Sequence, residues 1–190
     1  MKKLVVIVFV VLAAIVLILV SYPYMVSVQR LEVTRTVRVF KLSSTAFSDG
    51  GRMPERYTCM GLDVSPPLRW EGYPLETRSF TLIVEDIDAP GGVFTHWIIY
   101  NIPANVSMLE EEVEKVSVLP SGVMQGLNDF GRIGYGGPCP PAGKPHRYIF
   151  KIFALDAVLD IKPAASRNEV LKALENHIIG KAELTGIFSR

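Results

Sequence analysis

Three polar segments, distant from one another in the chain, carry side chains that could hold a small anion or a metal ion. They supply two carboxylates, two imidazoles and a phenol: Asp86, Asp88, His96, His146 and Tyr148. Each has an ordinary structural explanation, because aspartates cap turns and a lone histidine on an apolar strand is usually a hydrogen-bonded core residue. All three segments, however, stand at the ends of predicted strands, beside loops, where folds commonly place binding groups. Their joint occurrence therefore indicates a site.

A metal centre and a covalent mechanism both fit this set poorly. Two aspartates and two histidines suit zinc or iron, but their spacing matches no known ligand pattern such as HExxH, so we expect neither a metal nor a cofactor. Nucleophilic catalysis needs an activated Ser, Cys or Thr. There is no G-x-S-x-G motif, and Cys139 has Cys59 as a potential partner. We expect no enzyme; the less favoured alternative is a small hydrolase or lyase with His96 and His146 as acid and base.

The same residue types suit the binding of a phosphate or a carboxylate. Imidazolium and phenol groups donate hydrogen bonds to an anion, and a protonated histidine adds its charge. Two carboxylates would repel such a ligand. We therefore expect Asp86 and Asp88 to orient the imidazoles without touching the anion.

The loop of residues 134–148 should form one wall of this site. It contains four prolines and four glycines, a composition that excludes a helix or a central strand. Since proline lacks an N–H, hydrogen bonds from the loop to a ligand must come from amides such as those of Gly136, Gly137 and Cys139. We expect Gly137 and Pro138 to line the site.

Short segments of alternating apolar and polar residues must position these groups. Residues 79–85 are predicted as a half-buried strand and residues 148–154 as another, with its even-numbered residues on one face. Between them, residues 94–102 are predicted as a strand with one face formed by Phe94, His96, Ile98, Tyr100 and Ile102. Turn residues separate the strands, a pattern typical of a sandwich of antiparallel sheets.

One helix is marked at its start by the capping-box pattern of residues 166–169. Apolar residues follow at helical spacing as far as Ile178, and Gly180 is expected to end the helix. Residues 182–188 are predicted as a last strand. The charged run of residues 110–115 is interpreted as a solvated turn or a short helix.

The N-terminus indicates membrane insertion. Two lysines precede an unbroken apolar run from Leu4 to Val20, and no good signal-peptidase site follows it. At about 1.5 Å per residue, a helix over residues 4–26 reaches roughly 34 Å, enough to cross a hydrocarbon core of about 30 Å. We predict an uncleaved signal-anchor that makes a single pass through the cell membrane.

This interpretation divides the chain into three parts. Residues 1–26 are the transmembrane segment, residues 27–38 a stalk or extra edge strand, and residues 39–190 one extracytoplasmic domain. A cleaved signal peptide that releases a secreted domain is the alternative.

Charge and cysteine content narrow the expected partners. The net charge of +1 gives no indication of nucleic-acid binding, so we expect membrane contact through the N-terminal helix alone. Cys59 and Cys139 are the only cysteines, and an extracytoplasmic compartment favours a disulfide between them. Two separate, half-buried thiols are the alternative.

Several motifs occur here in the order in which they occur in the phosphatidylethanolamine-binding protein family. They are Tyr57-Thr58-Cys59, Ser65-Pro66-Pro67-Leu68-Arg69-Trp70, Asp86-Ile87-Asp88-Ala89-Pro90, Phe94-x-His96-Trp97, Asn101-Ile102-Pro103, Gly136-Gly137-Pro138-Cys139-Pro140-Pro141 and His146-Arg147-Tyr148. Over residues 39–190 the chain most resembles the short bacterial and archaeal branch, the Raf-kinase-inhibitor-like proteins. One difference is Ile87, where the family motif has proline; both carboxylates are kept.

The resemblance implies a mainly β fold, a sandwich of a large and a small antiparallel sheet with one or two short helices. It also implies a pocket for phosphate-like or carboxylate anions, formed by Asp86, Asp88, His96, Gly137, Pro138, His146 and Tyr148. Family members bind phospholipid headgroups, inhibit kinases or serine proteases, or act in signalling complexes, and the fold does not choose among these. For an extracytoplasmic domain we expect binding of a small anion or phospholipid headgroup, with inhibition of a serine protease as the alternative.

Overall fold

The computed structural model of the chain describes residues 11–22 and 36–190, which belong to two separate units. Residues 11–22 are helical. Within these two ranges, no helix is both long and apolar enough to cross a bilayer. The predicted membrane span also takes in residues 4–10 and 23–26, and the predicted stalk residues 27–35. These positions lie outside the described residues.

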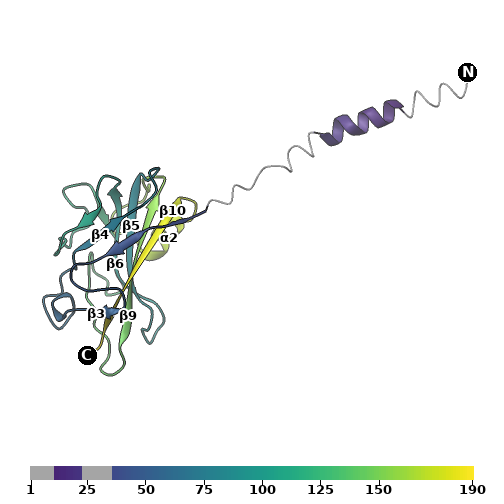
Figure 1. Cartoon of the computed structure of the whole chain (residues 1–190). Helices are drawn as coiled ribbons and strands as arrows, with labels where there is room; N and C mark the ends of the chain where they lie inside the picture. Colours follow the sequence, from purple (N-terminus) through teal and green to yellow (C-terminus); the bar gives the residue numbers. More distant parts are fainter. Residues whose placement is uncertain (1–10, 23–35) are drawn as a thin grey trace, which may run out of the picture. The chain divides into compact units, whose positions relative to one another are not determined.

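Residues 36–190 form the predicted pair of sheets (Figure 1). The larger sheet of this unit has seven strands: β1 (Arg38–Val39), β3 (Gly51–Arg52), β5 (Ser79–Asp86), β6 (Phe94–Pro103), β8 (Met124–Gln125), β9 (His146–Leu155) and β10 (Ile178–Phe188). The smaller sheet of the same unit has three: β2 (Lys41–Ser43), β4 (Leu68–Glu71) and β7 (Met108–Leu109). A 3-10 turn, η1 (Glu55–Tyr57), and a helix, α2 (Arg167–Leu174), lie between the strands.

The strand order of the larger sheet is β1-β10-β9-β5-β6-β8, and β3 also pairs with β10. Most pairs are antiparallel, but β1 and β3 both run parallel to β10, where Arg38 pairs with Gly180 and Gly51 with Gly186. The prediction of purely antiparallel sheets is therefore wrong at this edge. The cause is the path of the chain, which leaves the larger sheet after β1, forms β2 in the smaller sheet and returns to the same edge as β3.

The space between the two sheets holds the main hydrophobic core. The ring of Phe80 in β5 lies 5.4 Å from that of Trp70 in β4, and Phe47 lies 5.6 Å from Phe150 of β9. The residues predicted to share one face of the third strand are all buried in this core: Tyr148, Phe150, Ile152 and Ala154. Each large apolar side chain buried here stabilises the fold by about 1.5–3 kcal/mol.

The opposite face of the larger sheet is covered by α2, so β5 is buried on both faces, whereas the sequence predicts burial on one. Ile83 of β5 belongs to a second apolar cluster with Val170 and Leu174 of α2. Polar residues of β5 also lie under this cover, and some of them have partners there. The side chain of Ser79, for example, donates to a backbone oxygen at 2.5 Å.

An irregularity in the pairing of β5 with β6 changes which residues of β6 face the main core. Asn101 has a φ of 58°, and the register of the two strands shifts beside it. As a result Ile102 lies in the main core together with Ile99. The prediction that Ile102 shares a face with Ile98 is therefore wrong, because Ile98 lies on the opposite face. A β-bulge shifts the alternation of a strand by one residue in this way.

The capping box predicted at the start of α2 is confirmed. The side chain of Ser166 accepts from the N–H of Glu169, and the carboxylate of Glu169 accepts from the N–H of Ser166 at 2.8 Å. The helix ends earlier than predicted, at Leu174, and β10 begins already at Ile178. Gly180 therefore lies inside β10 and is not a helix terminator.

Replacing Glu85 should destabilise the domain, because α2 is joined to the sheet through this side chain. Glu85 is 2% exposed and accepts from Arg167 Nε of α2 at 2.6 Å and from Lys151 Nζ of β9 at 2.7 Å. Burial alone would raise the pKa of Glu85, but the two cations outweigh it and hold the pKa below its ordinary value. For Glu85→Gln we expect a loss of about 2–3 kcal/mol in unfolding free energy, somewhat less than for a fully buried pair because both cations are partly in water.

Urea unfolding at neutral pH tests this expectation, with Glu71→Gln as the control. Glu71 pairs with Lys41 at 2.9 Å, but both side chains are largely exposed, so its replacement should leave the midpoint nearly unchanged. The stabilisation by Glu85 is present above its unfolded-state pKa and should be lost as the pH falls through its lowered folded-state pKa. Equal midpoint shifts in the two variants would contradict this account.

Candidate functional site

Three neighbouring strands bring predicted site residues to one end of the larger sheet. Asp86, the last residue of β5, pairs with Tyr148 of β9 on one side and with Phe94 of β6 on the other. Residues directly opposite each other in an antiparallel pair have side chains on the same face. His146 lies two positions from Tyr148 and shares that face. The register thus gathers groups from segments 60 residues apart.

Asp86 fixes the orientation of His146. Nδ1 of His146 lies 2.7 Å from Oδ2 of Asp86, and both side chains are buried. A carboxylate only accepts, so Nδ1 carries the hydrogen and Nε2 is the ring nitrogen left for another partner. Oδ1 of Asp86 accepts from the N–H of Asp88 at 2.9 Å, as in a capped turn. Asp86 therefore both caps the turn and orients an imidazole, as predicted.

Asp88 does not orient an imidazole, contrary to the prediction. Its carboxylate forms a two-point ion pair with Arg147, at 2.8 Å to Nε and 2.7 Å to a terminal nitrogen, and also accepts from the N–H of Arg147. These bonds lower the pKa of Asp88 to about 2. Arg147 lies between His146 and Tyr148 in a strand, so its side chain leaves on the opposite face. The ion pair lies on that side.

A second β-bulge places His96 beside Tyr148. Residues 84 and 85 of β5 pair with residues 97 and 95 of β6, which leaves His96 as an extra residue in its strand. Its ring stands edge-on to that of Tyr148, with centroids 5.1 Å apart. Because Tyr148 belongs to the main core, His96 lies on the main-core side of the sheet. The prediction that His96 shares a face with Ile98 is therefore wrong. Bulges often re-aim a side chain beside a binding site.

The backbone of the Gly/Pro-rich loop holds the ring of His96. Nδ1 lies 2.6 Å from the oxygen of Gly136, whose N–H donates back to the oxygen of His96 at 2.9 Å. Because a carbonyl accepts, Nδ1 again carries the hydrogen and Nε2 is left. The side chain is 3% exposed, and burial lowers the pKa of His96, only partly offset by the loop carbonyls. The imidazole is therefore neutral at pH 7 in this state.

The hydroxyl of Tyr148 is an unsatisfied donor. The side chain is fully buried, and its hydroxyl has no hydrogen-bond partner in the described part of the chain. Asp86 is close enough to raise the pKa of the phenol, but its carboxylate already accepts from the N–H of Asp88 and from His146. Burial first, and then the charge of Asp86, raises the pKa of Tyr148 far above its ordinary value, so the proton is retained. Leaving such a group unpaired costs about 1–3 kcal/mol.

Gly137 and Pro138 follow the residue that holds His96, and their backbone groups are already engaged. The N–H of Gly137 donates to Asp63 at 2.6 Å, and the oxygen of Pro138 accepts from the N–H of Cys59 at 3.1 Å. The expectation that the amides of Gly136 and Gly137 donate to a ligand is therefore wrong. Both amides instead donate to other groups of the domain.

The predicted disulfide between Cys59 and Cys139 is confirmed, and it excludes the alternative of two separate thiols. The two Cα atoms are 5.4 Å apart, and both residues are exposed. The bond ties the segment after η1 to the loop that holds His96. A second tie runs nearby, because the hydroxyl of Tyr135 donates to the oxygen of Tyr57 at 2.7 Å.

The charged run of residues 110–115 is more than the solvated turn that the sequence predicts. Glu111 accepts from the hydroxyl of Tyr57 at 2.7 Å, and Lys115 Nζ lies 2.9 Å from the carboxylate of Asp63. Asp63 also accepts from the N–H of Gly137, so this run is connected through Asp63 to the Gly/Pro-rich loop.

Two aromatic residues that lie against His96 are not among the predicted site residues. The rings of Phe94 and Phe130 lie 5.2 and 5.3 Å from that of His96 and 4.7 Å from each other. The guanidinium of Arg132 lies 5.2 Å from the centre of the Phe130 ring. The available sequence signal is an aromatic residue inside the polar turn of residues 128–131. No comparable signal marks Asp63.

The cluster can form hydrogen bonds to a ligand, but it lacks an activated nucleophile. It offers the Nε2 atoms of His96 and His146 and the hydroxyl of Tyr148, whereas the sulfur of Cys139 is in the disulfide. Among residues 11–22 and 36–190, no group of three or more His, Cys, Asp or Glu side chains is arranged to hold a metal ion.

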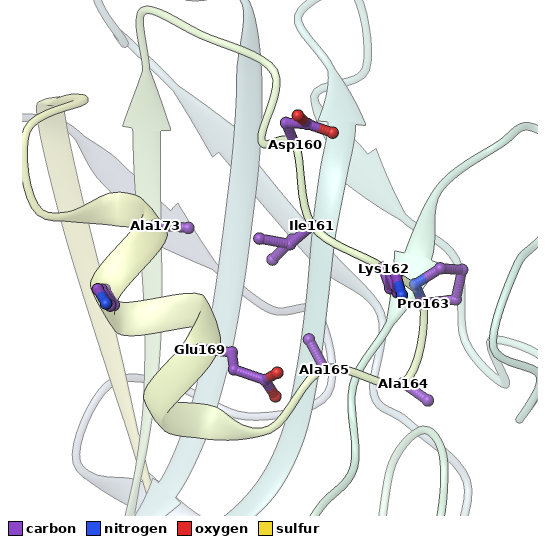
Figure 2. Close-up of a pocket in the computed structure, with 9 residues that line it drawn as sticks. Asp160, Ile161, Lys162, Pro163, Ala164, Ala165, Glu169 and Ala173 are labelled. Carbon is purple, nitrogen blue, oxygen red and sulfur yellow. The ribbon is translucent and has the colours of Figure 1, made fainter.

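A separate open groove of about 1030 Å³ lies between α2 and the loop before it (Figure 2). Its lining includes Asp160, Ile161, Lys162 and Glu169, and none of the predicted site residues. Glu169 is held by Ser166 in the capping box, so its carboxylate serves the helix.

Comparison with known proteins gives a consistent family. The model of the phosphatidylethanolamine-binding protein family matches residues 43–189. A UPF0098 protein of Methanothermobacter thermautotrophicus is 52% identical over 149 residues, which are 78% of this chain and 98% of that protein. A UPF0098 protein of Aquifex aeolicus is 46% identical over 154 residues, 80% of this chain and 90% of the relative.

Solved structures agree with the sequence relatives. A phosphatidylethanolamine-binding protein homologue of Chlamydia trachomatis has a TM-score of 0.73 and 41% identity, over 80% of this chain and 99% of that one. E. coli YbcL, described as a member of the mammalian family, has a TM-score of 0.74 and 37% identity, over 80% and 98%. The chain therefore belongs to the phosphatidylethanolamine-binding protein family, in its bacterial and archaeal branch.

Proposed function

We propose that the domain binds a small anion, a phosphate or a carboxylate, between His96, His146 and Tyr148, and that it is a binding protein and not an enzyme. The observation that carries the proposal is the buried hydroxyl of Tyr148, which keeps its proton and lacks an acceptor among the residues described. Buried donors are rarely left unpaired in folded proteins. An anion oxygen supplies the acceptor that this hydroxyl needs.

The two imidazoles support the same ligand. Each Nδ1 already faces an acceptor, which leaves each Nε2 for a ligand. A proton added to Nε2 makes the ring a cation that donates a charge-assisted hydrogen bond. Burial disfavours that cation at His96 when no anion is present, and a bound anion favours it. Anion binding is therefore coupled to proton uptake.

The nearby carboxylates do not oppose such a ligand strongly. Both oxygens of Asp86 accept hydrogen bonds, from Asp88 N–H and from His146, and Asp88 is neutralised by Arg147. A free phosphate, a carboxylate and a phospholipid headgroup all present suitable oxygens to the same donors. A binding role is favoured over catalysis because the sulfur of Cys139 is not available as a nucleophile.

We further propose that the N-terminal segment is an uncleaved single-pass anchor in the cell membrane, with the domain outside the cytoplasm. The large apolar side chains of residues 11–22 are all exposed, among them Leu17 at 70%. A helix that is apolar all round is typical of a membrane span. The disulfide supports an oxidising compartment for the domain.

Tyr148→Phe should weaken anion binding without lowering stability. The phenyl ring keeps the contact with His96 and loses a hydroxyl that has no partner in the ligand-free protein, so the melting temperature should stay the same or rise. Loss of one hydrogen bond to a charged ligand should reduce the affinity by about ten- to a hundredfold, as measured by calorimetric titration of inorganic phosphate. As a control, Tyr135→Phe breaks a satisfied hydrogen bond and should lower stability by about 1 kcal/mol. Unchanged affinity in Tyr148→Phe contradicts the proposal.

Binding should weaken as the pH rises, and His146 should matter more than its charged neighbour in the loop. Acetate, which stays ionised in this range, can be titrated between about pH 5.5 and 8.5, across the histidine range. Its affinity should fall over this interval because the imidazolium is lost, and His96 should contribute only at the acidic end, since its pKa is lowered. His146→Ala should remove more affinity than Lys144→Ala, whose side chain is exposed. A flat wild-type profile, or equal affinity in all three proteins, sinks the proposal.

The full-length protein should sediment with membranes, resist extraction by salt and keep its N-terminus. Protease added from outside should digest the domain in intact cells. A chain that starts after residue 22 should be soluble and serves as the control. Recovery of a soluble natural form that begins near residue 22 would show a cleaved signal peptide.

A further inference from the structure

The chain enters the domain at the end of the larger sheet that is farther from the His96–His146–Tyr148 cluster. Arg38 of β1 lies at the same level of the sheet as Phe80 of β5. The successive pairs that connect them across β10 and β9 are Arg38 with Gly180, Gly180 with Ala154, and Ala154 with Phe80. The cluster lies where β5 ends, at Asp86, six residues further, or about 20 Å along the strand. In Figure 1 the cluster's end of the sheet is marked by β3 and the C-terminus.

The end at which the chain enters carries strongly exposed apolar side chains. Val39 of β1 is 78% exposed, and Leu75 is 97% exposed. Leu75 lies in the turn between β4 and β5, and its neighbour Pro74 lies so close to Gly180 that a Cβ there would come within 2.9 Å. This turn therefore sits against the start of β10, next to β1.

Two further exposed apolar residues belong to the same end. Val37 directly precedes β1, and Val158 follows Ala157, whose oxygen accepts the hydroxyl of Ser79 at the start of β5. Val37, Val39, Leu75 and Val158 are called the tether end below. None of these four side chains belongs to either apolar cluster of the domain.

Cations accompany these side chains. Arg38 and Lys181 are exposed in the paired strands β1 and β10, and Arg78 is exposed at the end of the Leu75 turn, with Glu76 as an acidic neighbour. Basic side chains are attracted to anionic headgroups, and apolar ones insert at the boundary of headgroups and acyl chains. The tether end thus combines the two features of a membrane-facing surface.

We propose that the tether end rests on the bilayer that anchors the chain, so that the His96–His146–Tyr148 cluster faces away from it. The proposal rests on the membrane anchor proposed above. The opposite end also exposes Met60 and Leu62. The chain does not enter the domain there, because β1 pairs with the start of β10. The cluster therefore takes its anion from the aqueous phase and not from a headgroup of its own membrane.

The domain of residues 36–190 can be tested by itself. Its apolar clusters lie within that range, and the Methanothermobacter relative consists almost entirely of the matching region. The experiment is co-sedimentation with vesicles of phosphatidylglycerol and phosphatidylcholine, with pure phosphatidylcholine vesicles for comparison. Wild type should bind the anionic vesicles, and less so at high salt. Val39→Asp/Leu75→Asp should lower the partition coefficient by about tenfold or more, because two inserting side chains become anionic.

Met60→Asp/Leu62→Asp is the matched control, with the same change of charge at the other end, and should stay nearer to wild type than the tether-end variant. Circular dichroism melting verifies that both variants fold. His146→Ala and added inorganic phosphate should leave vesicle binding unchanged, because the cluster is not the lipid contact. If wild type ignores the vesicles, if the control loses binding and the tether-end variant does not, or if phosphate releases the domain, the proposal is overturned.

The outcomes separate this proposal from the anchor on which it rests. A full-length protein that fractionates with membranes, together with a domain that ignores vesicles, overturns only the orientation. A full-length protein that is naturally soluble, together with a domain that binds vesicles through the tether end, overturns the anchor and keeps the surface.

Discussion

The pairing of β5 with β6 on one side and with β9 on the other is the interaction on which the rest of the domain depends. These three strands contribute side chains to both apolar clusters, and their registers set the row Phe94, Asp86 and Tyr148. His146 and His96 reach the cluster from this row, one by strand alternation and the other by a bulge. A slip of one residue in β9 would turn its side chains to the other face, so the same registers fix the core and the site.

Neighbouring carboxylates at the end of β5 show how one strand serves both purposes. Glu85 points to the covered face, where Lys151 and Arg167 compensate its charge and join α2 to the sheet. Asp86 points to the main core side, where it holds the ring of His146. Each carboxylate is buried and each is paired. Removing the partner of a buried charge would lower the free energy of unfolding by about 3–5 kcal/mol. Stability and ligand chemistry are thus separated by the alternation of a single strand.

Much of this arrangement could be predicted from the sequence where the signal is local or where a motif is specific. The capping box of α2 is local. The sandwich follows from the order of the motifs and the disulfide from the limited choice of partners. The pairing of Asp86 with an imidazole follows from the repulsion expected between a carboxylate and an anion. The face of His96 could not be predicted, since the bulge that turns it depends on the registers of two distant strands. The partner of Asp88 was equally inaccessible, because Arg147 had to be placed on the opposite face first.

The position of β10 has a consequence for how the protein is made. β1 and β3, the first strands of the larger sheet, both pair with β10, which ends two residues before the C-terminus. During translation these early strands lack their partner in the sheet until β10 has been made. This edge of the larger sheet can therefore form only after nearly all of the domain has been made, and long-range pairing of this kind is intrinsically slow. A chain that lacks β10 would therefore also leave β1 and β3 without the strand with which they pair.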